Sequence, residues 1–236
     1  MKIFVLVPIL KQRAFEEVTY NELKPLARDD VELVVDSIVK GPASIESEYD
    51  ELLASPWIAE KAAWADKNGF DAIIIDCMGD PALEGCREIT SIPVLGPCQS
   101  SMAVASTISD RFTVVTVLKR LIPLLWRNAK RYGFETKMAS VRSVEVPVLD
   151  LDEKRDEVKA SLLAESKKAL DQDGADTIIL GCTGLVGMAR ELQEALKVPV
   201  VDPAVAAMKL AEALVDMKIS HTKLVYPEPP PKERRS

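Results

Sequence analysis

Two short apolar runs stand out in the pattern of hydrophobic and polar positions along the chain. Residues 72–75 read Ala-Ile-Ile-Ile and residues 177–180 read Thr-Ile-Ile-Leu, and both are rich in β-branched side chains. Runs of this kind are too short for helices and are typical of central strands of a parallel sheet, covered by helices on both faces. Each run leads within two residues to a cysteine, Cys77 or Cys182. We therefore expect both thiols at the carboxyl ends of buried strands.

The two runs belong to an internal repeat. Cys77 aligns with Cys182 at an offset of about 105 residues, and the glycines and aspartates that precede the runs share this offset. After one inserted residue, Ile92-Pro-Val-Leu-Gly-Pro97 matches Val198-Pro-Val-Val-Asp-Pro203. Two equivalent halves predict a pseudo-twofold axis with a single active site on it, where the two thiols face each other.

The rest of the pattern alternates between strands and helices, which predicts an α/β fold. Strands are expected at 2–8, 31–36, 93–95, 111–117 and 141–146, and helices at 11–29, 55–67, 80–89, 99–109, 121–132, 153–171, 185–196 and 204–216. In this assignment Pro56 takes the first position of its helix, Asp80 caps the helix after Cys77, and Thr183 or Gly184 opens the helix after Cys182. Both thiols are then expected beside helix N-termini.

The repeat also predicts how the chain divides. Each half forms a lobe with a small parallel sheet of about four strands flanked by helices, and the active site lies in the cleft between the lobes. The final helix crosses back to the first lobe, so lobe 1 comprises residues 1–97 and 205–225 with Cys77, and lobe 2 comprises residues 98–204 with Cys182. The Pro-rich segment 226–236 has little apolar material, so we expect it to be extended or disordered.

Composition narrows the class of protein. The 236 residues are 47% hydrophobic and 28% charged with a net charge of −7, which is typical of a soluble globular protein and argues against a nucleic-acid partner. The apolar run after Met1 is too short for a signal peptide and no run is long enough to span a bilayer, so we expect a cytoplasmic protein without a membrane partner. Four scattered cysteines and one histidine predict neither a disulfide framework nor a metal site.

Two facing thiols can act as an acid and a base. A thiol has a pKa of about 8.5 that a helix N-terminus lowers, so one cysteine is expected as a thiolate and the other as a thiol. The thiolate removes a proton from one face of a substrate carbon and the thiol protonates the other face, which inverts the stereocentre. The chain has no Gly-x-Gly-x-x-Gly or P-loop pattern, so we expect no cofactor. Backbone N–H groups around Met78, Gly79, Thr183 and Gly184 are candidates to bind the anionic intermediate.

The chain resembles the cofactor-independent aspartate/glutamate/hydantoin racemase superfamily, and within it the hydantoin (allantoin) racemase branch. The resemblance rests on Gly41-Pro-Ala-Ser-Ile-Glu-Ser47, Cys77-Met-Gly-Asp-Pro-Ala-Leu83, Arg111-Phe-Thr-Val-Val-Thr116 and Gly181-Cys-Thr-Gly184. It implies a two-lobed fold, proton transfer by Cys77 and Cys182 without pyridoxal phosphate or metal, and a homo-oligomer in the cytoplasm. It also implies a set of substrate-lining residues, namely Ser44, Ile45, Gly79, Thr116, Thr183 and Gly184.

Several positions depart from the pattern of the hydantoin branch. Val7-Pro8-Ile9 stands where the branch usually has Asn-Pro-Asn, Val117 follows Thr116 in place of a hydroxyl residue, and Pro97-Cys98-Gln99 replaces an Ala-Glu pair after Gly96. These changes predict a less polar cavity. Cys86 and Cys98 are interpreted as small buried hydrophobes, and the lone His221 as an exposed residue without a role.

The resulting hypothesis is a racemase or epimerase that inverts an acidic C–H stereocentre of a small molecule, with a 5-substituted hydantoin or a related amino-acid derivative as substrate. A free amino-acid racemase of the aspartate/glutamate kind and a cis-trans isomerase, in which one cysteine adds to a double bond, are the alternatives within the same fold. A binding module that has lost activity and a redox role for the cysteine pair are the alternatives from other classes.

Overall fold

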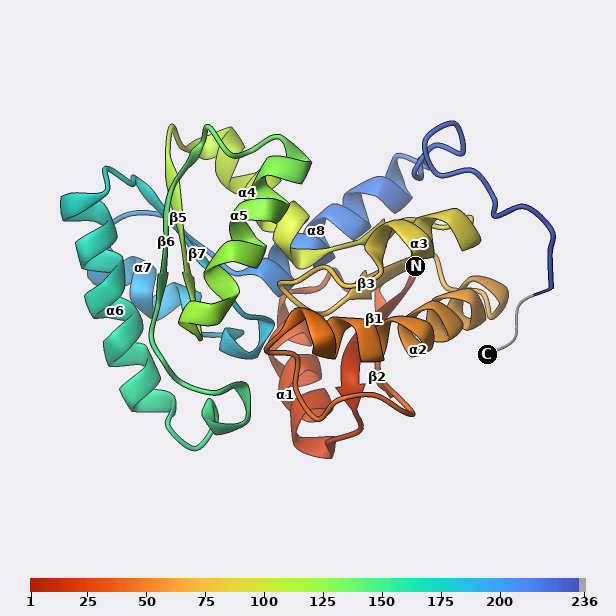
Figure 1. The fold of residues 1–236 in the computed structure, drawn as a ribbon, viewed down its shortest axis with the longest axis horizontal. Helices are drawn as coiled ribbons and strands as arrows, with labels where there is room; N and C mark the ends of the chain where they lie inside the picture. Colours follow the sequence, from red (N-terminus) through yellow and green to blue (C-terminus); the bar gives the residue numbers. More distant parts are fainter. Residues whose placement is uncertain (234–236) are drawn as a thin grey trace.

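The protein is built from two four-stranded parallel sheets that lie side by side (Figure 1). The structure is a computed structural model that describes residues 1–233, apart from the side chains of residues 13 and 14. The strand order is β2-β1-β3-β4 in the first sheet and β6-β5-β7-β8 in the second, so the two sheets share one topology. This arrangement confirms the predicted α/β fold with two related halves.

The first sheet and its helices come from the first half of the chain. These elements are β1 (Lys2–Leu10), α1 (Arg13–Leu23), β2 (Glu32–Ile38), α2 (Glu48–Lys67), β3 (Ala72–Ile75), α3 (Leu83–Ile89) and β4 (Val94–Leu95). The first apolar run is β3, a central strand whose four residues are all buried. Helix α2 contacts β1, β2 and β3, while α1 contacts β2.

The second sheet repeats the pattern. Its elements are α4 (Pro97–Ile108), β5 (Phe112–Thr116), α5 (Ile122–Tyr132), β6 (Met138–Ser143), α6 (Arg155–Gln172), β7 (Thr177–Leu180), α7 (Ala189–Leu196) and β8 (Val200–Val201), followed by α8 (Pro203–Asp216). The second apolar run is β7, again central and fully buried, and it pairs with β5 as β3 pairs with β1.

Helices α4 and α8 pack against each other at the junction of the two halves (Figure 1). Helix α4 also contacts β7 and β8 of the second sheet, whereas α8, at the far end of the chain, contacts β3 and β4 of the first sheet. Buried side chains of α8, among them Ala207, Met208 and Ala211, join the core beneath β1 and β3. The two sheets are thereby held together by helices that each follow the short edge strand of the opposite half.

The start of α2 differs from the sequence-based expectation. The helix begins at Glu48, not near Ser55, because the Ser47 side chain accepts a hydrogen bond from the Asp50 N–H and caps it. Pro56 therefore lies inside the helix, where it cannot donate to the carbonyl of Leu52. The residue before the proline adds a side-chain bond to the helix, because the Ser55 hydroxyl donates to the Glu51 carbonyl at 2.6 Å.

The C-terminal segment after α8 returns to the first sheet. Lys223 Nζ donates to the carbonyls of Arg87, Glu88 and Thr90 at the end of α3, and the Arg87 guanidinium donates to the Tyr226 hydroxyl at 3.2 Å. Residues 226–233 have no helix or strand, and the last three residues of the predicted tail lie outside the described part. His221 is half-buried, with Nε2 at 3.1 Å from the Thr90 carbonyl oxygen, so the expectation of an exposed side chain was wrong.

Candidate active site

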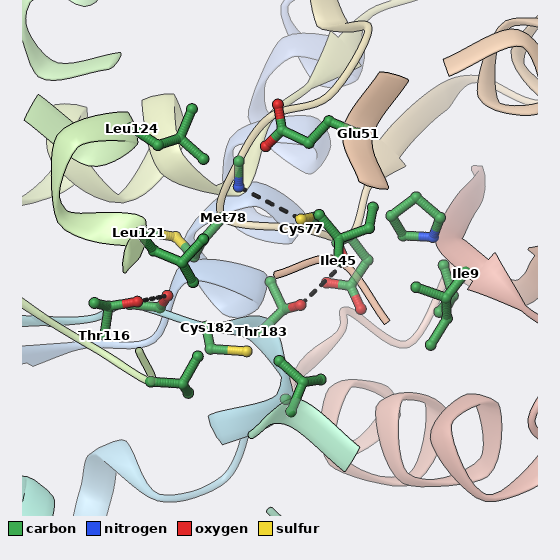
Figure 2. A pocket seen from close by; sticks show the side chains of 18 of the residues that line it. Ile9, Ile45, Glu51, Cys77, Met78, Thr116, Leu121, Leu124, Cys182 and Thr183 are labelled. Carbon is green, nitrogen blue, oxygen red and sulfur yellow. Dashed lines mark hydrogen bonds between the residues drawn. The ribbon is translucent and has the colours of Figure 1, made fainter. Parts of the chain in front are cut away.

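One cavity opens where the carboxyl ends of the two sheets meet, and both Cys77 and Cys182 line it. Each cysteine follows a central strand by two residues, because β3 ends at Ile75 and β7 ends at Leu180. Both thiols are free and half-buried. Figure 2 shows them on facing sides of the cavity, with Cys77 above and Cys182 below. The structure thus brings together the two repeat-related cysteines that the sequence singled out.

The two strand ends are tied to each other and to their neighbours by hydrogen bonds (Figure 2). The Thr183 hydroxyl donates to the Asp76 carbonyl at 3.1 Å and so joins the two cysteine loops directly. The Thr116 hydroxyl donates to the Gly181 carbonyl at 3.0 Å, which fixes β7 to β5 beside Cys182. Both hydroxyl protons are therefore already donated to the backbone.

The loop after each cysteine turns back onto the sulfur. The Gly79 N–H donates to Cys77 Sγ at 3.4 Å, and the Gly184 N–H points at Cys182 in the same way and opposes the rise of its pKa. These N–H groups were predicted to bind an anionic intermediate, but they face the sulfurs. They can stabilise a thiolate when it forms.

The helices after the cysteines begin later than the sequence suggested. Helix α3 starts at Leu83, and Cys182 is followed by a 3-10 turn (Thr183–Leu185) before α7 starts at Ala189. Neither thiol therefore lies at the N-terminus of an α-helix, and the expected lowering of the thiol pKa is wrong. Burial raises the pKa of Cys182 to about 12 and that of Cys77 well above its usual value, with the charge of Glu51 adding to the effect at Cys77.

Asp80 caps a helix, although not the one expected. Its backbone has a φ of +52°, and its carboxylate accepts hydrogen bonds from the N–H groups of Cys98 and Gln99, both at 2.9 Å, in the first turn of α4. The Tyr132 hydroxyl donates to the same carboxylate at 2.8 Å. Burial raises the pKa of Asp80 to about 6 against the opposing effect of these donors. Asp80 thus fixes the loop that holds Cys77 to the start of α4.

The remaining predicted substrate-lining residues fall into two groups. The cavity wall contains Ile45, Met78, Gly79, Thr116, Thr183 and Gly184. Ser44, the neighbour of Ile45, is half-buried but does not line the cavity, so the structure does not support a contact between its side chain and a substrate. Cys86 and Cys98 are buried outside the cavity, in keeping with their interpretation as packing residues.

The wall is mostly apolar. The sequence departures Val7 and Ile9 line it, together with Pro8 between them. Further apolar residues come from α1, α5 and the loops of the second half, namely Phe15, Val117, Leu121, Leu124, Leu125 and Val148. Within the described side chains, the lining includes no Lys, Arg or His. Nor do the described residues group three His, Cys, Asp or Glu side chains as metal ligands. The cavity therefore favours an uncharged and largely apolar ligand.

Two carboxyl groups in the wall were not assigned to it from the sequence. Glu51 reaches the cavity from α2 and Asp76 from the end of β3, and burial raises the pKa of each to about 7. Their Oε1 and Oδ1 atoms are buried and have no hydrogen-bond partner within residues 1–233. Glu51 was missed because the helix was expected to begin only at residue 55. The pairing of Ser47 with Asp50 three residues later was the available signal for an earlier helix start.

This fold and this site define a class of protein. Two pseudo-symmetric α/β halves meet at one cavity, and each contributes a cysteine from an equivalent strand end. The chain belongs to the Asp/Glu/hydantoin racemase family, whose model matches residues 14–211. It is a racemase of this family and resembles the hydantoin and allantoin racemases.

Individual relatives support this assignment. The chain is 40% identical over 208 residues to a hydantoin racemase from Pseudomonas sp. (strain NS671), covering 87% of this chain and 84% of the relative. It is 39% identical over 183 residues to a hydantoin racemase from Rhizobium meliloti, covering 78% and 76%. The solved allantoin racemase from Klebsiella pneumoniae superposes with a TM-score of 0.95 at 29% identity and covers 100% of this chain and 96% of its own.

Proposed function

We propose that this racemase inverts the C5 stereocentre of a 5-substituted hydantoin, or of a related uncharged amino-acid derivative, by proton transfer between Cys77 and Cys182. The observation that carries the proposal is the presence of two free thiols at equivalent strand ends of one cavity. The hydantoin racemases among its relatives support the substrate class.

The reaction needs one thiolate and one thiol. A thiolate takes the C5 proton from one face of the ring, and the electron pair left behind delocalises onto the adjacent carbonyl oxygen as an enolate. The opposite thiol then gives its proton to the other face of C5, which restores the neutral ring with inverted configuration. The two sulfurs have exchanged roles, so the reverse reaction follows the same path and no atom is gained or lost.

The thiolate has to form in a site that disfavours it. Burial raises the pKa of both thiols, so both are protonated in the resting protein at neutral pH. The N–H group of Gly79 faces one sulfur and that of Gly184 faces the other, and each N–H stabilises its thiolate form. A buried thiolate with few partners is also a strong base, as the removal of a weakly acidic carbon-bound proton requires.

Cavity charge separates this proposal from its alternatives. A free aspartate or glutamate, or the unsaturated diacid of a cis-trans isomerase, brings at least one carboxylate into the cavity. The described wall offers no basic side chain to pair with it, and Glu51 and Asp76 would repel it. An uncharged hydantoin avoids this cost, and its 5-substituent can contact the apolar wall.

The test is racemisation of enantiopure 5-benzylhydantoin followed by polarimetry, with the wild-type protein and single cysteine variants. We expect Cys77→Ala and Cys182→Ala each to lower kcat by at least roughly 1000-fold, because each removes one of the two proton carriers. Cys86→Ala removes a buried thiol outside the cavity and should keep the wild-type rate. Racemisation that survives in either cavity variant would contradict the proposal.

A further inference from the structure

Glu51 presents an unused hydrogen-bond acceptor to the cavity. It lies in the first turn of α2, and Figure 2 shows it on the same side of the cavity as Cys77. Its Oε1 atom is buried without a hydrogen-bond partner in the described part of the chain. A buried, unpaired carboxyl oxygen is costly, so such a group in a binding cavity points to a partner that arrives with the ligand.

The loop after Cys77 is shaped around this carboxyl group. A Cβ atom built on Gly79 would lie 1.9 Å from Glu51 Oε1 and 3.0 Å from its Cδ, so any side chain at position 79 would displace the carboxyl group. Gly79 also donates its N–H to Cys77 Sγ. The same glycine thus leaves room for Glu51 and holds the sulfur, which places the acceptor next to the reacting thiol.

The charged groups around Glu51 do not provide it with an ion-pair partner among the described residues. The positive charge of Arg127, from α5, acts on Glu51, but Arg127 forms its ion pair with Glu48, one turn earlier on α2. The other groups that act on Glu51 are acidic: Asp80 from the loop after β3, and Glu48 and Asp50 from α2. On the cavity side it faces the Cys77 thiol. Burial, with the added effect of the three acidic groups, raises the pKa of Glu51 to about 7 against the opposing charge of Arg127.

We propose that Glu51 is a substrate-recognition residue whose carboxylate accepts a hydrogen bond from a ring N–H group of the substrate beside Cys77. The inference rests on the proposed function and deepens it, because it names the polar feature that the cavity selects. A hydantoin ring has two N–H groups, and an apolar cavity penalises each one that stays unpaired. A hydrogen bond from an N–H group to a carboxylate is stronger than one between two neutral groups, and it orients the ring over the sulfur.

The first experiment measures KM and kcat for 5-benzylhydantoin between pH 5.5 and 8.5 in the wild type, Glu51→Gln and Glu60→Gln. At pH 8 we expect Glu51→Gln to raise KM roughly tenfold, because an amide oxygen replaces a carboxylate acceptor. Below pH 6 the wild-type carboxyl group is protonated, so the two KM values should converge. Glu60→Gln removes an exposed negative charge from the same helix outside the cavity and should keep the wild-type KM profile.

The second experiment removes the donor from the substrate. Hydantoins methylated at N1 or at N3 lack one N–H each. We expect one of the two to have a raised KM in the wild type and a clearly smaller rise in Glu51→Gln, because the amide oxygen of the variant is the weaker acceptor for the same N–H group. A merely structural Glu51 would instead give equal methylation effects in both proteins.

The outcomes separate this inference from the proposed function. In one contradicting result the wild type racemises the hydantoins while Glu51→Gln leaves KM unchanged at pH 8, and in another the effects of methylation and substitution are additive. Either result would overturn the role of Glu51 and leave the two-thiol reaction intact. A wild-type protein that does not racemise any of these hydantoins would overturn the proposed function itself, and the inference would fall with it.

Discussion

Burial acts on every ionisable side chain of the cavity in the same direction. It raises the pKa of the thiols Cys77 and Cys182 and of the carboxyl groups Glu51 and Asp76, and it also raises that of Asp80, which lies outside the cavity wall. Each of these groups is therefore held toward its neutral form in the resting protein. The cost of creating charge in this cavity is what makes a thiolate formed there a strong base.

The first prediction concerns the rate of racemisation as a function of pH. Because the pKa of Cys182 is about 12 and that of Cys77 is well above its usual value, the thiolate fraction grows about tenfold per pH unit through neutral and alkaline pH. We expect kcat/KM for 5-benzylhydantoin to rise continuously from pH 7 to pH 10, as measured by circular dichroism. A plateau beginning at pH 7 would show a thiolate already present in the resting enzyme.

The second prediction concerns stability and Asp76. Its pKa is raised from 3.8 to about 7, so the folded protein binds this proton more tightly than the unfolded chain does. Stability from this group is therefore complete below about pH 4 and is lost as the pH rises toward 7, by up to roughly 4 kcal/mol. Asp76→Asn should show a smaller fall in unfolding free energy over this range in urea titrations, whereas the exposed control Glu135→Gln should follow the wild type.

At the residue scale, the sequence identified the functional residues that occur in both halves of the repeat and did not identify those that occur only once. Cys77 and Cys182 could be assigned because each ends an apolar run and the two runs share one offset. Glu51 has no repeat partner with this role, and its place in the cavity depends on a helix start that Pro56 obscured. No pattern in the sequence shows that a carboxyl group lies over Gly79 or that Asp80 caps α4.

The packing of elements explains why glycine precedes Cys182. A Cβ atom on Gly181 would lie 2.5 Å from Thr116 Cα on the neighbouring strand β5. The backbone of β5 cannot move away, because Thr116 is buried and donates its hydroxyl to the Gly181 carbonyl. The end of β7 and the position of the Cys182 sulfur therefore depend on a residue without a side chain at position 181.

This close approach gives the third prediction. Gly181→Ala should lower the unfolding free energy by about 1–3 kcal/mol through overpacking and should reduce racemisation by displacing Cys182. Gly85→Ala is the matched control, since a Cβ there has no neighbour within 4 Å and the residue lies inside α3. The control should raise stability by about 0.5–1 kcal/mol. Equal thermal melting temperatures for the two variants would contradict this account.

Most elements could be predicted from the sequence because hydrophobic periodicity and breakers agree there, as in α5, which ends at Gly133 with a φ of +79°. The errors arose where two start signals compete. Pro56 suggested a helix start, but the Ser47 cap begins α2 earlier, and turns separate both cysteines from the helices that follow. Local hydrogen bonds determine where these helices begin, and a single sequence does not show which of two competing start signals is the stronger.

At the scale of the whole molecule, the cavity belongs to both halves. The Asn128 side chain of α5 donates to the Gly79 carbonyl at 3.0 Å, and Glu46, from the loop before α2, accepts from the Val148 N–H at 2.7 Å. These bonds connect the two halves around the thiols, as α4 and α8 do behind them. No helix among the described residues is long and apolar enough to cross a membrane. The lobe boundaries, the homo-oligomer and the cytoplasmic location stay predictions.

The fourth prediction follows from the charge of the whole cavity. Replacing the benzyl group of the substrate with a carboxymethyl group brings an anion near Glu51 and Asp76 without a basic partner in the described wall. We expect kcat/KM for 5-carboxymethylhydantoin to be at least roughly 100-fold below that for 5-benzylhydantoin, since juxtaposed like charges cost several kcal/mol. The uncharged 5-carbamoylmethyl analogue controls for size and should lie between them. A preference for 5-carboxymethylhydantoin would redirect the assignment toward acidic substrates.

The most direct test of the two-thiol reaction is NMR of a single hydantoin enantiomer incubated with the enzyme in heavy water. With separate thiols on the two faces of C5, the product enantiomer forms with deuterium at C5, while the unreacted enantiomer recovered early in the reaction still has hydrogen there. This asymmetry should appear from either starting enantiomer. Early deuterium in the recovered starting enantiomer would mean that one group both removes and returns the proton, and would contradict proton transfer between Cys77 and Cys182.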